Sequence, residues 1–172
     1  MASGDTLVCW RALDAELPDG DFAVFDTLTA VATGANDPVW PYLMYDDAVN
    51  RYAYFGSVMP AHYSGGGVNV QVVWMSPATS GNCVWIVSFK RMEDGVQRLD
   101  NLFFGNETFI IAPTDAVAHV IDYSTIAVSD GADLNLIEAG EYFWMEMFRD
   151  GDSGNDTLTN EARLLSIIIS EQ

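Results

Sequence analysis

An acidic stretch near the end of the chain has side chains and spacing suited to cation binding. The sequence DGDSGNDTLTNE places Asp150, Asp152 and Asp156 at positions one, three and seven of a twelve-residue window, with Glu161 at position twelve. Carboxylates at these positions are typical of a calcium loop. Position six, which needs glycine for the sharp turn of an EF-hand, is Asn155, and strand-like segments flank the window. An EF-hand is therefore excluded. A looser calcium site in a loop between two strands stays open, and no other cofactor is expected.

No other pattern in the sequence indicates a catalytic site. The two histidines, His62 and His119, have no H-x-H, H-E-x-x-H or C-x-x-C motif beside them. No G-x-S-x-G motif marks a nucleophile, and the glycine run 65–67 lacks the lysine of a phosphate-binding loop. Among 25 acidic residues some carboxylates will lie close together by chance, so a glycosidase pair cannot be read from the sequence. We predict no catalytic residues and no enzyme activity.

The composition predicts one acidic, folded domain. The chain has 172 residues, of which 49% are hydrophobic and 19% are charged, and its formal net charge is −18. Such a composition is typical of a folded chain, and the charge repels nucleic acid and anionic membrane surfaces. The N-terminus shows no secretion signal, and no apolar run is long enough to span a membrane. Cys9 and Cys83 allow at most one disulfide, which the sequence does not decide.

The apolar residues alternate with a period of two in short runs, which indicates β-strands. The strongest runs are residues 68–75 and 83–92, which we expect to form an antiparallel pair, followed by residues 141–150 and 162–172. Weaker candidates are residues 22–28, 42–45, 54–59, 108–112 and 125–129. These strands predict an all-β fold, a jelly-roll-like β-sandwich of about eight short antiparallel strands. Residues 1–21 are polar and interrupted by Pro and Gly, so we expect an N-terminal arm before a single domain over residues 22–172.

Aromatic side chains on two of these strands are candidates for a contact surface. Trp144 and Phe148 lie on the second face of the strand at 141–150, which is unusually apolar. Tyr42 and Tyr45 form a second candidate patch if they are exposed. Burial between two sheets is the alternative explanation for all four residues.

The layout of residues 68–100, with Ala139-Gly140-Glu141 leading into a strand that ends at Arg149-Asp150, resembles small β-sandwich virion proteins of tailed bacteriophages. The resemblance covers about the last two thirds of the chain. It implies a head decoration (cement) protein on the outer capsid surface, or a fibre or tail accessory subunit. It further implies the major capsid protein as partner and, because such proteins often occupy three-fold positions, a homotrimer.

Two functions follow from these observations. The first is a structural protein that stabilises a phage head through protein interfaces. The second is a carbohydrate-binding β-sandwich of a phage fibre or tail, which would use aromatic side chains and the acidic loop with calcium. A hydrolase on the same fold is a third and weaker alternative.

Overall fold

Ten strands and one short 3-10 helix form the regular structure of the computed structural model, which describes residues 4–30, 37–100 and 103–172. In chain order they are β1 (Thr6–Arg11), η1 (Ala12–Asp14), β2 (Val24–Thr29), β3 (Val39–Tyr45), β4 (Arg51–Val58), β5 (Val68–Met75), β6 (Asn82–Met92), β7 (Thr108–Pro113), β8 (Asp122–Val128), β9 (Tyr142–Arg149) and β10 (Ala162–Glu171). The all-β prediction is confirmed. No helix among the described residues is long and apolar enough to cross a membrane.

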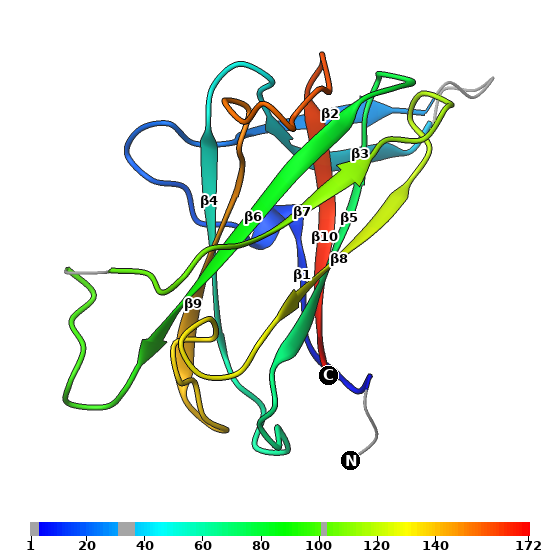
Figure 1. The fold of residues 1–172 in the computed structure, drawn as a ribbon. Helices are drawn as coiled ribbons and strands as arrows, with labels where there is room; N and C mark the ends of the chain where they lie inside the picture. The colour runs from blue at the N-terminus through cyan, green and yellow to red at the C-terminus, as the bar shows by residue number, and fades with distance from the viewer. Residues whose placement is uncertain (1–3, 31–36, 101–102) are drawn as a thin grey trace.

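The strands form two antiparallel sheets that pack face to face as a sandwich (Figure 1). The four-stranded sheet has the order β4-β9-β6-β7. The six-stranded sheet has the order β2-β3-β10-β5-β8, and β1 pairs with β10 beside this path. Alternate side chains from both sheets meet in one apolar core, as the period of two requires. The predicted jelly-roll-like sandwich is therefore confirmed.

The pairing predicted for the strands at 68–75 and 83–92 is wrong. β5 pairs with β10 and β8 in one sheet, whereas β6 pairs with β9 and β7 in the other. The two strands face each other across the core, where the rings of Trp74 and Trp85 meet edge to face with centroids 5.8 Å apart. An alternating pattern tells which side chains are buried. It does not tell whether the neighbouring strand lies beside them or across the core.

Residues 6–11 do not form an arm. They make up β1, which pairs with β10, and Trp10 is buried against Phe55 and Phe143 with ring centroids 5.5 Å and 6.0 Å away. The sandwich thus begins well before residue 22. A register shift between Thr6 and Val8 interrupts the alternation, so this strand carries a weak sequence pattern.

The two cysteines are not bonded to each other. Cys9 is exposed on β1, and Cys83 is buried in the core on β6. Burial raises the pKa of the Cys83 thiol well above its ordinary value, so this side chain behaves as a small apolar group.

Candidate functional site

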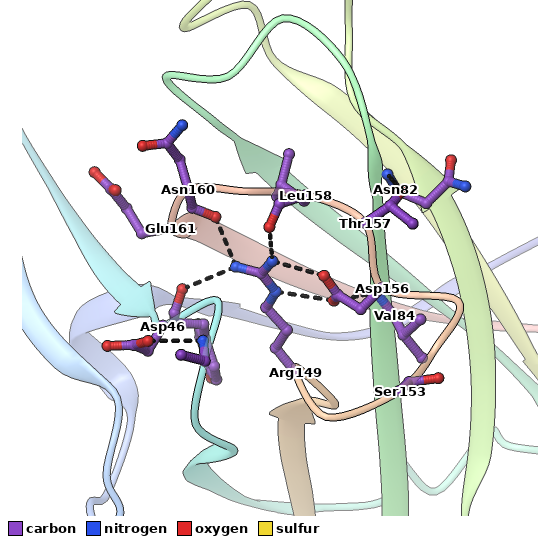
Figure 2. Close-up of polar contacts among 12 residues, drawn as sticks. Asp46, Asn82, Val84, Arg149, Ser153, Asp156, Thr157, Leu158, Asn160 and Glu161 are labelled. Atoms are coloured by element: carbon purple, nitrogen blue, oxygen red, sulfur yellow. Dashed lines mark hydrogen bonds and ion pairs between the residues drawn. The ribbon is translucent and has the colours of Figure 1, made fainter.

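The acidic loop between β9 and β10 closes around a buried arginine (Figure 2). Asp156 accepts two hydrogen bonds from the Arg149 guanidinium, at 2.9 Å from Nε and 2.7 Å from Nη2. The backbone N–H of Val84 also donates to the Asp156 carboxylate, at 2.9 Å. The side chains of Arg149 and Asp156 are 0% and 1% exposed. This is a fully desolvated, bidentate ion pair, the strongest arrangement for these two groups.

The calcium prediction is wrong about its central ligand, because a cation of the chain itself already occupies the Asp156 carboxylate. Glu161, expected at the twelfth position, pairs instead with Arg163 at 2.6 Å. Asp150 and Asp152 do not join Asp156 in a metal site, since no group of three acidic, His or Cys side chains among the described residues could hold a metal ion.

Three of the four predicted contact residues are buried. Tyr45 lies in the core against Trp85, with ring centroids 5.0 Å apart. Tyr42 is covered by the guanidinium of Arg163, 4.9 Å from its ring centroid. Phe148 packs in a small buried cluster on the outer face of the four-stranded sheet. These residues are therefore not available as an exposed patch, and burial is the correct explanation for them.

Trp144, the fourth predicted residue, lies half-buried in a groove of about 560 Å³ on the outer face of the four-stranded sheet. The groove is lined by Glu16, Leu17, Tyr54, Leu99, Phe104, Trp144 and Glu146.

β9 supplies Trp144 and Glu146 because its alternate residues Phe143, Met145 and Met147 point into the core. Tyr54 points outward from β4 for the same reason, since Ala53 and Phe55 are buried beside it.

Two segments outside the sheet complete the groove. Glu16 exchanges backbone hydrogen bonds of 2.8 Å and 2.9 Å with Tyr54, so residues 16 and 17 run along the free edge of β4. Phe104 stacks on the Tyr54 ring with centroids 5.5 Å apart and an interplanar angle of 24°. The Gly105 N–H bonds the carbonyl of Phe89 at 2.9 Å, which holds this segment against β6.

Gly56 on β4 lets the rings of Tyr142 and Trp144 pack directly against the backbone of the sheet beside the groove. It is opposite Trp144 in the register, and a Cβ atom built at this position would be 2.2 Å from the Tyr142 hydroxyl and 3.4 Å from the Trp144 ring. The missing side chain thus leaves room for both rings. They meet edge to face with centroids 5.8 Å apart, which restricts the orientation of Trp144.

Glu146 is the half-buried carboxylate of the groove. Burial raises its pKa, and the negative charge of Glu107 raises it further, whereas hydrogen bonds from Tyr54 and Ser88 lower it. The Ser88 hydroxyl donates to Oε1 of Glu146 at 3.1 Å. Burial and the adjacent carboxylate raise the pKa of Tyr54 to about 12. The groove therefore presents aromatic rings beside two carboxyl groups, whose oxygens accept hydrogen bonds.

The groove has residue types that are common in ligand-binding sites. Its lining combines apolar ring faces with a few acceptor groups, the usual composition of a small-molecule site. None of the described lining residues is Ser, Cys or His, while Glu16 and Glu146 carry carboxyl groups, which in enzymes serve as general acids and bases. Sequence reasoning identified Trp144 and the apolar face of its strand. It missed Glu16, Leu99 and Phe104, which reach the groove only through the tertiary fold.

No family model and no curated protein matches the sequence. Among solved structures, an exo-β-1,3-galactanase from Phanerochaete chrysosporium matches with a TM-score of 0.50 and 14% identity, over 98% of this chain and 29% of that chain. This chain therefore spans less than a third of the galactanase.

Two smaller structures also match. A family 35 carbohydrate-binding module from Clostridium thermocellum has a TM-score of 0.48 and 12% identity, over 94% of this chain and 95% of that chain. The C-terminal CBM6 of a laminarinase from Zobellia galactanivorans has a TM-score of 0.48 and 14% identity, over 97% and 100%. At these identities the likeness to the galactanase shows the β-sandwich fold alone.

Removing one partner of the buried ion pair should destabilise the fold strongly. We expect Asp156→Asn to lower the free energy of unfolding by about 3 to 5 kcal/mol, because it leaves the Arg149 charge buried without a counter-ion. Urea denaturation measures the loss. The control is Arg98→Gln, which breaks an exposed pair with side chains 76% and 65% accessible and should cost at most about 1 kcal/mol. Equal effects of the two variants would contradict the assignment.

Calcium should not stabilise the protein. Since Arg149 already neutralises Asp156, we expect the same melting temperature with excess chelator and with millimolar calcium. Differential scanning calorimetry gives the comparison. If calcium raises the melting temperature, and Asp150→Asn and Asp152→Asn abolish this rise, the loop binds calcium and our expectation is wrong.

Proposed function

We propose that this chain is a non-enzymatic carbohydrate-binding module, and that the groove on the outer face of the four-stranded sheet holds the sugar. The observation that carries the proposal is the convergence of Tyr54, Phe104 and Trp144 with the carboxylates of Glu16 and Glu146 in one groove. The four-stranded sheet supplies the central residues from neighbouring strands. Strands hold side chains more rigidly than loops do, so little ordering is needed on binding.

The groove suits the two kinds of surface that a sugar ring presents. One kind is the apolar C–H face of the ring, which stacks on flat aromatic side chains. The other kind is the rim of hydroxyl groups, which donate hydrogen bonds to carboxylates. A volume of about 560 Å³ falls in the usual range for a small-ligand site. This volume is large enough for a few sugar rings of a longer chain.

Loss of an aromatic side chain from the groove should weaken binding strongly. We expect Trp144→Ala and Tyr54→Ala each to weaken binding of the best polysaccharide by tenfold or more, about 1.4 kcal/mol, because each removes a stacking surface. Isothermal titration calorimetry over a panel of soluble xylans, galactans, glucans and chitin oligosaccharides identifies that ligand, and a reducing-end assay tests that it is not cleaved.

Tyr123→Ala is the matched control for these variants. Tyr123 is 65% exposed on β8, in the opposite sheet, so its removal should leave both binding and stability unchanged. Near-ultraviolet circular dichroism verifies that each variant keeps the fold. Failure of every polysaccharide in the panel to bind, or equal weakening by Tyr123→Ala, would reject the proposal.

Capsid decoration is the second candidate function, and one observation favours it. An apolar hollow of about 220 Å³ lies on the outer face of the six-stranded sheet, lined by Leu28, Trp40, Met75, His119, Ile121 and Leu165. A hollow of this composition suits a protein partner, here the major capsid protein or two further copies of this chain.

The decoration proposal predicts a homotrimer that binds assembled capsids. We expect Trp40→Ser to reduce both trimer formation and co-sedimentation with capsids, because Trp40 is 55% exposed and aromatic anchors dominate protein interfaces. Light scattering coupled to size exclusion measures the mass. A monomer that does not sediment with capsids would exclude this function and leave the carbohydrate proposal standing.

A further inference from the structure

The charges in the groove are all of one sign. Glu16 and Glu146 are the ionisable acids that line it, and Glu107 lies near enough to raise the pKa of Glu146. Burial raises the pKa of Tyr54 to about 12, so its hydroxyl adds no charge. Lys90 on β6 is opposite Trp144 in the register and points to the same face as Ser88, but it does not line the groove.

Most cations of the chain are engaged in ion pairs elsewhere, and Arg11 and Lys90 are in none of these pairs. The sequence has seven Lys and Arg residues, and five of them form ion pairs with Asp or Glu, namely Arg51, Arg91, Arg98, Arg149 and Arg163. None of these pairs includes Glu16 or Glu146. Within the described part of the chain, both groove carboxylates are therefore without an ion-pair partner, although the protein carries a net charge of −18.

A negative charge on Glu146 is energetically unfavourable in this position. A half-buried carboxylate loses part of its hydration, and the hydroxyls of Ser88 and Tyr54 compensate it only with neutral hydrogen bonds. An ammonium group bound beside it would restore a counter-charge through a charge-assisted hydrogen bond. The site is thus better matched to a cationic ligand than to a neutral one.

The aromatic side chains favour the same ligand. Ring faces carry negative potential and attract cations. Tyr54, Phe104 and Trp144 line the same groove as the two carboxylates. An amino sugar combines an apolar ring face with an ammonium group, so one ligand satisfies both features. A uronate presents a carboxylate to Glu16 and Glu146 and would be repelled.

We infer that the groove selects glycans that carry a protonated amine, as in N-deacetylated chitin, over their N-acetylated and uronate counterparts. This inference rests on the proposed carbohydrate-binding function and names the ligand class of the same site. Glu146 supplies the partly desolvated counter-charge, Glu16 adds a second at the edge of β4, and the aromatic residues hold the ring.

The test compares glucosamine, N-acetylglucosamine and galacturonate oligomers of equal length by calorimetry at low salt, near neutral pH. We expect the glucosamine oligomer to bind at least tenfold tighter than the N-acetylated one, and the galacturonate oligomer not to bind. Glu146→Gln should reduce this preference at least fivefold while retaining a side chain of the same shape. Added salt should weaken the binding, since the carboxylates are only partly buried.

Asp152→Asn is the matched control, because it removes one negative charge at an exposed loop position outside the groove. It should leave the preference unchanged. If neutral oligomers bind equally well or better and Glu146→Gln has no effect, the inference is overturned while the carbohydrate function stands. If no oligomer or polysaccharide binds, the proposed function itself fails. Polylysine that binds as tightly as the glucosamine oligomer, without loss in Trp144→Ala, would reveal a general attraction of cations to the acidic surface and would also overturn the inference.

Discussion

A guanidinium buried at one end of the sandwich makes five hydrogen bonds, as many as it has N–H donors. Arg149 binds the Asp156 carboxylate and the carbonyls of Leu158 and Asn160 in its own loop, and it reaches the carbonyl of Tyr45 in the opposite sheet. Burying a charge costs several kcal/mol unless it is fully partnered. These hydrogen bonds therefore fix the positions of the loop, the end of β3 and the end of β9 relative to one another.

Strand β9 connects the buried ion pair to the groove. Arg149 is the last residue of β9, and β9 runs between β4 and β6. Its inner residues join the core, and its outer residues Trp144 and Glu146 form the centre of the groove. The same strand thus ends in the buried ion pair and presents the candidate binding residues. Because both neighbours of β9 are paired along its whole length, these side chains stand on a rigid base.

The distribution of charge separates the two outer faces of the sandwich. Most cations are used in ion pairs, so the groove on the four-stranded sheet is left acidic and aromatic. The hollow on the six-stranded sheet is mostly apolar. His119 is among its lining residues, and Nδ1 of His119 lies 3.3 Å from Nη1 of Arg163. A ligand in the groove and a protein partner at the hollow would bind to opposite faces. Neither surface requires the other, which makes the two proposed functions independent.

The sequence by itself determined the all-β class, the sandwich and the strands with clear alternation, because a period of two in short apolar runs buries one face of each strand. It also determined that Trp144 lies on the face opposite Phe143 and Met145. Strand β1 was not predicted, because a register shift interrupts its alternation.

Only the tertiary structure decided which strands are neighbours, and this separated β5 from β6 into opposite sheets. It also decided that Tyr42, Tyr45 and Phe148 are buried, and that Arg149 rather than a metal ion neutralises Asp156. The physical reason is the same in each case. Alternation and spacing describe one strand or one loop, whereas burial, ion pairing and the walls of a groove depend on segments that are distant in the chain.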